Sequence, residues 1–183
     1  MSDSILIDGS AFAPGESGVV KIMVGRLPSD TDISIEAHVF RSQKPGPVVL
    51  ILAGVHGDEI NGIEIVRNFM FNQDFSSIST GSLIVIPLLN VYGFINFDRY
   101  VPDGKDVNRS FPGTLNGSLA SRIARTLTKY ILPNIDYIID FHTGGDSRYN
   151  YPQIRFTKTD EEAAQLAKVF NAPCIIQSGL IHK

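Results

Sequence analysis

The sequence lacks the features that define several classes of protein. Its 183 residues include a single cysteine, Cys174, which excludes an internal disulfide and any zinc site built from several cysteines. The 16 Lys and Arg against 19 Asp and Glu give a net charge of −3, with no basic block to bind nucleic acid or an anionic membrane. We see no signal peptide and no apolar run of membrane-spanning length. We therefore expect a cytoplasmic protein with neither a nucleic-acid nor a membrane partner.

Several common catalytic and architectural signals are absent as well. We find no serine nucleophile elbow, no Walker-type phosphate loop and no dinucleotide-binding glycine motif. No internal repeat, low-complexity tract or linker divides the chain. A chain of this length with 43% hydrophobic residues can bury a core of its own. We expect one domain over residues 1–183, in which residues 1–45 form the leading strands and turns.

The pattern of apolar residues alternates between strands and helices. The apolar run at residues 48–53, which shows no alternation, predicts a strand covered on both faces. Residues 83–86 predict a second buried strand, and the mostly apolar residues 135–141 predict a third strand. Apolar residues at helical spacing follow at three places, residues 60–70, 119–131 and 162–170. Together these predict an α/β fold with a mixed, mostly parallel central sheet and helices on both faces. Residues 90–117 predict a long irregular loop, a feature that is usually functional or mobile.

Two of the apolar strands lead to histidines. His56 follows residues 48–53, and His142 directly follows residues 135–141. Because ligands collect beyond the carboxyl ends of parallel strands, both imidazoles are expected at one rim. Glu59, three residues after His56, adds a carboxylate, and two nitrogens with one oxygen leave a zinc position open for water. The alternative is that Glu59 merely favours a helix N-terminus by its charge.

The long loop carries residues suited to the same site. Asn108 and Arg109 form a clamp for a substrate carboxylate, because the guanidinium fork matches a carboxylate bidentately. Asp106 can accept the outer N–H of a zinc-bound histidine, and Asp140 shares a strand face with the second histidine and can do the same. Arg99 can add a second positive group. The alternative is a solvated loop with ordinary ion pairs.

Three motifs resemble those of the succinylglutamate desuccinylase/aspartoacylase family, a branch of the zinc carboxypeptidase-like fold. They are Gly54-Val-His-Gly-Asp-Glu59, Asp106-Val-Asn-Arg-Ser-Phe-Pro-Gly113 and Ile139-Asp-Phe-His-Thr-Gly144, in family order. The resemblance implies roles for two sets of residues. The ligands of one Zn²⁺ would be His56, Glu59 and His142. The groups that hold the substrate would be Asn108, Arg109 and Arg99.

The resemblance also implies an activity, the hydrolysis of the amide bond of small N-acyl amino acids by zinc-activated water. Two alternatives remain: a metallocarboxypeptidase-like peptidase, and a non-catalytic module that binds zinc or a ligand. Zinc is favoured by the ligand types, although cobalt, manganese and iron accept the same set. A homo-oligomer is left open.

In this family the general-base glutamate comes from a later strand. The glutamates after His142 are Glu161 and Glu162, which we expect in the first turn of a helix. We therefore expect this chain to be the N-terminal portion of a longer family domain, with the C-terminal part missing. It would contain no catalytic general base, and would bind zinc yet turn over slowly or not at all.

Overall fold

The computed structural model describes residues 4–146 and 148–179. The chain divides into two compact units, Met1–Asp146 and Ser147–Lys183. Residues 1–45 fall within the first unit, and the single domain expected over residues 1–183 stays a prediction. In the part of the chain that the structure describes, no helix is long and apolar enough to cross a membrane.

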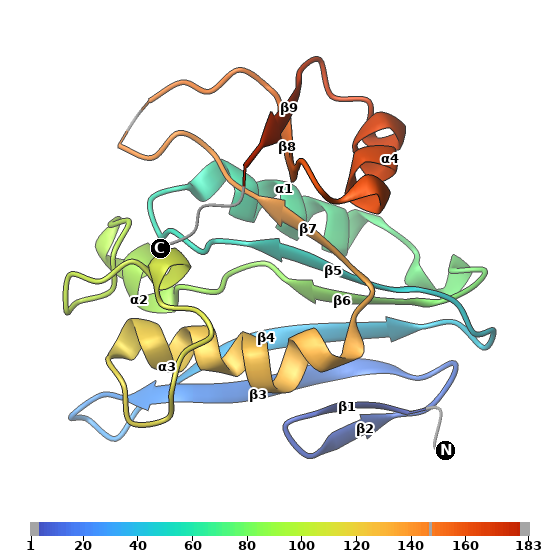
Figure 1. The fold of residues 1–183 in the computed structure, drawn as a ribbon. Helices are drawn as coiled ribbons and strands as arrows, with labels where there is room; N and C mark the ends of the chain where they lie inside the picture. The colour runs from blue at the N-terminus through green and yellow to red at the C-terminus, as the bar shows by residue number, and fades with distance from the viewer. Residues whose placement is uncertain (1–3, 147, 180–183) are drawn as a thin grey trace. The chain divides into compact units, whose positions relative to one another are not determined.

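The first unit is built on a mixed five-stranded sheet (Figure 1). Its strands, in spatial order, are β3 (Ser17–Arg26), β4 (Asp32–Arg41), β6 (Ser82–Ile86), β5 (Val48–Ala53) and β7 (Tyr137–Phe141). The pairs β5–β6 and β5–β7 are parallel, whereas β3–β4 and β4–β6 are antiparallel. The predicted mixed α/β sheet is confirmed, with its parallel pairing confined to the three apolar strands. A separate hairpin joins β1 (Ile5–Ile7) to β2 (Ser10–Phe12).

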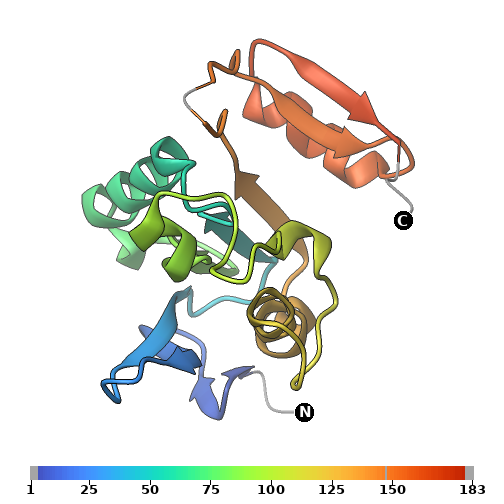
Figure 2. The ribbon, with the colours of Figure 1, turned by 90° about the vertical axis from the view of Figure 1, so that its left-hand side faces the viewer.

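Helices cover both faces of this sheet, as Figure 2 shows. On one face α1 (Ile60–Asn72) buries Val66 against Ile51 and Val85. On the other face α3 (Leu119–Thr126) buries Ile123 in the cluster that contains Leu50. Side chains of β5 therefore pack alternately against the two layers, which explains why this strand shows no polar alternation.

The helix predicted over residues 119–131 continues beyond α3. A π-helical turn (Leu127–Ile131) follows it, and a 3-10 turn (Leu132–Asn134) ends it. Pro133 lies in that last turn, as expected for a residue that cannot continue a helix. A further 3-10 turn, Phe75–Ser77, precedes β6.

The stretch of residues 90–117 is more ordered than predicted. It contains α2 (Val91–Asn96) and a 3-10 turn (Val107–Arg109). The Asn90 side chain caps α2 by accepting a hydrogen bond from the Gly93 N–H at 2.9 Å. Because α2 is only six residues long, its sequence shows too few turns for a periodic signal.

The second unit has a parallel pair of strands, β8 (Ile154–Thr157) and β9 (Ile175–Ser178), joined by α4 (Glu161–Phe170). Asp160 caps α4 by accepting a hydrogen bond from the Ala163 N–H at 2.8 Å. Glu161 and Glu162 lie in its first turn, as predicted. Strand β8 was not expected from the sequence.

Candidate metal centre

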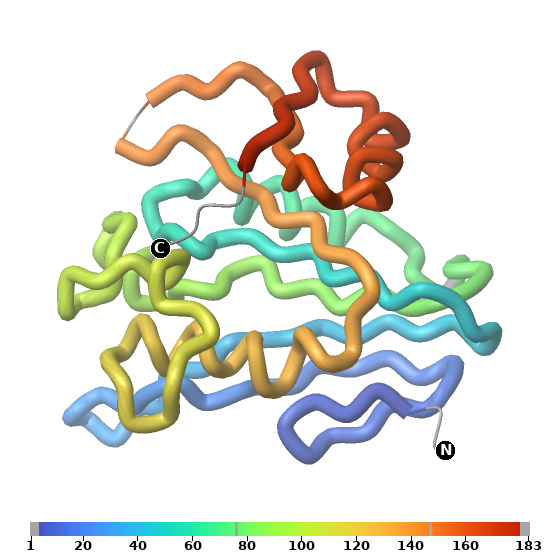
Figure 3. The backbone as a smooth tube through the Cα atoms, viewed as in Figure 1, coloured from blue at the N-terminus to red at the C-terminus, as the bar shows by residue number. Residues whose placement is uncertain are grey.

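Three side chains converge beyond the carboxyl ends of β5 and β7. These two strands run side by side in Figure 3 and pair in parallel, so the residues that follow them meet at one rim. His56 comes three residues after β5, His142 directly follows β7, and Glu59 precedes α1. One potential ligand atom from each lies within 4.8 Å of the other two. The structure thus brings together the three residues predicted as metal ligands.

Glycines shape the turn that carries His56. Gly54 has a φ of +66°, a conformation that side chains rarely adopt. A Cβ on Gly57 would lie 1.9 Å from the carbonyl carbon of Gly93, so only glycine allows this turn to pack against α2. The Gly57 N–H also donates to the Asp98 carbonyl oxygen at 3.1 Å. These contacts fix the direction in which His56 leaves β5.

The carboxylate of Glu59 joins the two histidines. Its Oε1 lies 2.7 Å from Nδ1 of His56, and its Oε2 lies 3.1 Å from Nδ1 of His142. The same Oε2 accepts the Thr143 N–H at 2.7 Å. Burial alone would raise the pKa of Glu59, but the two imidazoles and this N–H hold it well below its usual value. The Glu59 carboxylate is therefore ionised and able to ligate a metal, although only 4% of the residue is exposed.

The outer nitrogen of each histidine faces a carboxylate. Nε2 of His56 lies 3.2 Å from Oδ1 of Asp106, and Nε2 of His142 lies 2.8 Å from Oδ2 of Asp140. Such pairs hold each ring with Nε2 on a carboxylate, which leaves Nδ1 to bind a metal once any proton on it is released. Burial lowers the pKa of His142, but the hydrogen bonds to Asp140 and Glu59 outweigh it and raise this pKa to about 10. These are the contacts that the sequence predicted for Asp106 and Asp140.

Arg99 lies directly at this cluster. Its Nε and Nη2 donate to Oδ2 of Asp106 at 3.2 and 2.9 Å. Its Nη1 lies 3.3 Å from Nδ1 of His56 and 3.6 Å from Oε1 of Glu59. Although burial opposes the shift, the Arg99 hydrogen bonds help to lower the pKa of Asp106. From the sequence we expected Arg99 to add positive charge and, by the resemblance, to bind substrate. Its contacts with the predicted ligands were not expected.

Asn108 and Arg109 lie in the 3-10 turn beside Asp106, and both are exposed. The backbone N–H of Asn108 donates to Oδ1 of Asp106 at 2.8 Å. Among residues 4–146 and 148–179, neither side chain makes a hydrogen bond or an ion pair. The amide and the guanidinium are thus available to an external ligand.

Asp58 makes contacts at the rim that the sequence did not predict. Its Oδ2 accepts the Asp146 N–H at 2.9 Å, whereas its buried Oδ1 has no partner in the described part of the chain. Gly145 packs so closely that a Cβ there would lie 2.6 Å from Oδ2 of Asp58. Asp58 therefore fastens the segment after His142 to the start of α1.

The donor set suits a divalent transition metal. Two imidazole nitrogens and one carboxylate oxygen are the ligands of many three-residue catalytic zinc sites, and they leave further coordination positions open. The outer nitrogens are already oriented by Asp106 and Asp140, as such ligands require. The residues present therefore fit the metal that the sequence motifs imply.

Comparisons with known proteins cover most of this chain. The sequence model of the succinylglutamate desuccinylase/aspartoacylase catalytic domain matches residues 45–181, a range that includes all three motifs. The N-alpha-acetyl-L-2,4-diaminobutyric acid deacetylase of Halomonas elongata is 32% identical over an alignment of 137 residues, and the match covers 72% of this chain and 40% of that protein.

Solved structures agree with this match. A succinylglutamate desuccinylase/aspartoacylase from Rhodobacter sphaeroides is 29% identical with a TM-score of 0.77, over 90% of this chain and 52% of its own. The product-bound ectoine utilization protein EutE (DoeB) from Ruegeria pomeroyi is 27% identical with a TM-score of 0.78, over 93% of this chain and 55% of its own. This chain thus spans about half the length of the relatives it matches. It belongs to the succinylglutamate desuccinylase/aspartoacylase family.

Proposed function

We propose that this chain carries the metal site and the carboxylate-binding residues of a zinc-dependent deacylase. Its substrates would be N-acyl amino acids or similar small carboxylate-bearing amides, which it would cleave by hydrolysis. The observation that carries the proposal is the cluster of His56, Glu59 and His142 with a carboxylate on the outer nitrogen of each histidine. The deacylase character of the family and of its named deacetylase supports it. A cytoplasmic location and a homo-oligomer remain predictions.

The proposed site would hold one metal ion, and residues of this chain would bind the ion and orient its ligands. When bound, zinc supplies Lewis acidity to the scissile carbonyl and lowers the pKa of water. Nδ1 of His56 and of His142 would bind it together with Glu59, while Asp106 and Asp140 fix the two rings. Zinc is our choice among the metals that accept this donor set.

Arg109 and Asn108 would bind the carboxylate of the substrate. Support comes from their exposed position beside Asp106 and from the absence of other partners for either side chain in the described residues. A guanidinium fork binds a carboxylate with two parallel hydrogen bonds, which orients the substrate as well as attracting it. Arg99, beside the ligands, would stabilise the negative charge that develops on the carbonyl oxygen.

Hydrolysis requires a general base that takes a proton from the attacking water and then donates it, as an acid, to the leaving nitrogen. Glu161 and Glu162 lie in the first turn of α4 in the second unit, and we assign this role to neither. We therefore expect the chain by itself to bind zinc and substrate while turning over slowly or not at all.

The experiment combines metal analysis with binding and turnover. We expect one zinc per chain after dialysis, and binding of N-acetyl amino acids to the zinc-loaded chain by calorimetry. Arg109→Ala should weaken that binding about tenfold or more, because charged hydrogen bonds are lost, and should leave zinc in place. Arg26→Ala is the control, since Arg26 is exposed at the end of β3 and pairs with Asp30 and Asp32.

Three outcomes would change the proposal. Loss of zinc from Arg109→Ala would contradict the separation of metal-binding from substrate-binding residues. Tighter binding of short peptides than of acyl amino acids would indicate a metallocarboxypeptidase-like enzyme. Rapid turnover of N-acyl amino acids would show that a general base is present in this chain.

A further inference from the structure

One side chain beside the candidate metal centre carries the same sign of charge as a metal ion. Nη1 of Arg99 lies 3.3 Å from Nδ1 of His56 and 3.6 Å from Oε1 of Glu59. Those two atoms are 2.7 Å apart, and both belong to residues of the proposed ligand set. Arg99 is thus in contact with two of the three proposed ligands.

Arg99 is held in this position from its other side. Its Nε and Nη2 bond to Oδ2 of Asp106, whose Oδ1 faces Nε2 of His56. Arg99 therefore contacts His56 directly at Nδ1 and, through Asp106, indirectly at Nε2. The Asp106 side chain is only 12% exposed and that of Arg99 is 32% exposed, so solvent ions screen this group of charges incompletely.

Arg99 and a metal ion would use the same lone pairs of His56 and Glu59. When the neutral His56 ring donates from Nε2 to Asp106, its Nδ1 carries a lone pair that faces the same point as a lone pair of Glu59 Oε1. Two lone pairs at this distance repel each other, so this form of the ring is stabilised by a hydrogen-bond donor or a metal ion at that point. Arg99 Nη1 can donate an N–H there, and a divalent metal requires the same lone pairs. Two like charges so close also repel at the effective dielectric constant of a protein.

We propose that Arg99 competes with the metal ion for His56 Nδ1 and Glu59 Oε1, and thereby weakens metal binding at this site. The proposal rests on the metal site of the proposed function and adds a determinant of its affinity. By linkage, a substrate oxygen that binds Arg99 and draws it from the ligands tightens metal binding, and the metal tightens substrate binding by the same factor.

The opposite role is a scaffold. If Arg99 acted chiefly by holding Asp106 against His56, its removal would loosen the histidine and weaken metal binding. The sign of the change in metal affinity therefore distinguishes competition from support.

The test measures zinc and cobalt dissociation constants of the full chain by competition with a chromophoric chelator. Arg99→Gln should bind both metals about tenfold or more tightly than the wild type, since it removes one close positive charge. Arg99→Lys keeps the charge but not the fork, and its affinity should lie between the two. Arg67→Gln is the control: it makes the same change of charge on α1, where Arg67 pairs with Glu64 at 2.6 Å on the surface. Its affinity should stay within about threefold of the wild type.

Equal or weaker metal binding by Arg99→Gln would overturn the competition, provided that circular dichroism shows a folded protein. If this variant is unfolded, Arg99→Lys decides, and an affinity at or below that of the wild type overturns the proposal. His142→Ala in each background separates this failure from that of the proposed function. If His142→Ala changes no metal affinity in either background, no metal site exists there and both proposals fall. If it abolishes binding in both but Arg99→Gln is not tighter, only the competition fails.

Discussion

The two ends of strands β5, β6 and β7 both gather polar side chains, but these side chains bond to different partners. At the carboxyl ends, the bonds join side chains that titrate. Glu59 contacts His56 and His142, and each histidine contacts a further aspartate. His56 and Glu59 are buried, with 2% and 4% of their surfaces exposed.

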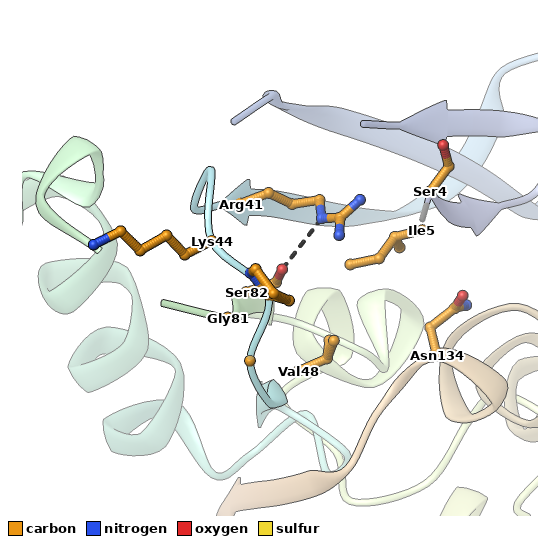
Figure 4. Close-up of a pocket in the computed structure, with 10 residues that line it drawn as sticks. Ser4, Ile5, Arg41, Lys44, Val48, Gly81, Ser82 and Asn134 are labelled. Atoms are coloured by element: carbon orange, nitrogen blue, oxygen red, sulfur yellow. Dashed lines mark hydrogen bonds between the residues drawn. The ribbon is translucent and has the colours of Figure 1, made fainter. Parts of the chain in front are cut away.

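At the amino ends, side chains bond mainly to backbone groups. Nη1 of Arg41 donates to the Phe12 carbonyl oxygen at 2.6 Å, Nδ2 of Asn134 donates to the Tyr130 carbonyl oxygen at 2.9 Å, and Oδ2 of Asp136 accepts from the Val48 N–H at 2.8 Å. Arg41 also contacts Ser82 beside a cavity of about 220 Å³ (Figure 4). These bonds fasten loops and strand ends to one another.

This difference distinguishes a structural end of the sheet from the end that carries the candidate site. Most side-chain hydrogen bonds in proteins go to backbone or water, and bonds between two side chains are a minority. Buried charges that pair mainly with one another give little net stability, because their desolvation offsets their attraction. A buried cluster of this kind therefore indicates a site for chemistry or binding. Variants at the carboxyl end should alter metal affinity, and variants at the amino end should alter stability.

The largest effect is expected for His142→Ala. It removes one of the three proposed ligands. Loss of a residue that only hydrogen-bonds to a ligand costs up to about 100-fold in metal affinity, so loss of a ligand itself should lower zinc affinity by more than that. Chelator competition measures the affinity. The fold should persist, because a third of this side chain is exposed. An unchanged affinity would contradict a metal site at this end of the sheet.

At the opposite end, Gly81→Ala should reduce stability. Gly81 has a φ of +76°, and a Cβ there would lie 2.3 Å from the Pro47 carbonyl oxygen. The left-handed conformation costs about 1–2 kcal/mol, and the close contact adds to this cost in the free energy of unfolding. Gly104→Ala is the matched control, with a φ of +74° and no atom within 4 Å. Urea denaturation should show a clearly larger loss for Gly81→Ala, and equal losses would argue against the contact.

Asp140→Asn tests the outer partner of His142. The weaker acceptor should orient the ring less well and lower zinc affinity about tenfold. Thermal unfolding should change little, because the Asp140 side chain is partly exposed and bonds to no backbone group in the described residues. A loss of stability without a change in affinity would place Asp140 with the structural residues instead.

The smallest effect is expected for Asp136→Ala, four residues earlier in the chain. It removes the acceptor of the Val48 N–H, which should cost about 1 kcal/mol of stability. Zinc affinity measured on the folded protein should equal that of the wild type. A reduced affinity would show that the two ends of the sheet are coupled.

Much of the site could be predicted from the sequence because the strands carry it. Mostly apolar runs form β5 and β7, and a histidine follows each run. Once the strands are parallel neighbours, geometry brings His56 and His142 to one rim. The contacts of Asp106 and Asp140 follow from the need of each imidazole for an outer acceptor.

Other features left no local signal. The Thr143 N–H that binds Glu59 is a backbone group, which every residue but proline has. The place of Arg99 depends on the path of a loop that is held by Asp106, and residue types do not specify this path. The antiparallel half of the sheet arises from long-range pairing of β4 with β6. Strand β8, with four residues, is too short for a clear pattern.

The account depends on three side chains sharing one ion, and X-ray absorption at the zinc edge of the zinc-loaded chain tests this most directly. We predict nitrogen and oxygen ligands at about 2.0–2.2 Å, with outer-shell scattering from two imidazoles. The spectrum of His142→Ala should show one imidazole. Two imidazoles in that variant, or sulfur at about 2.3 Å in the wild type, would contradict the account.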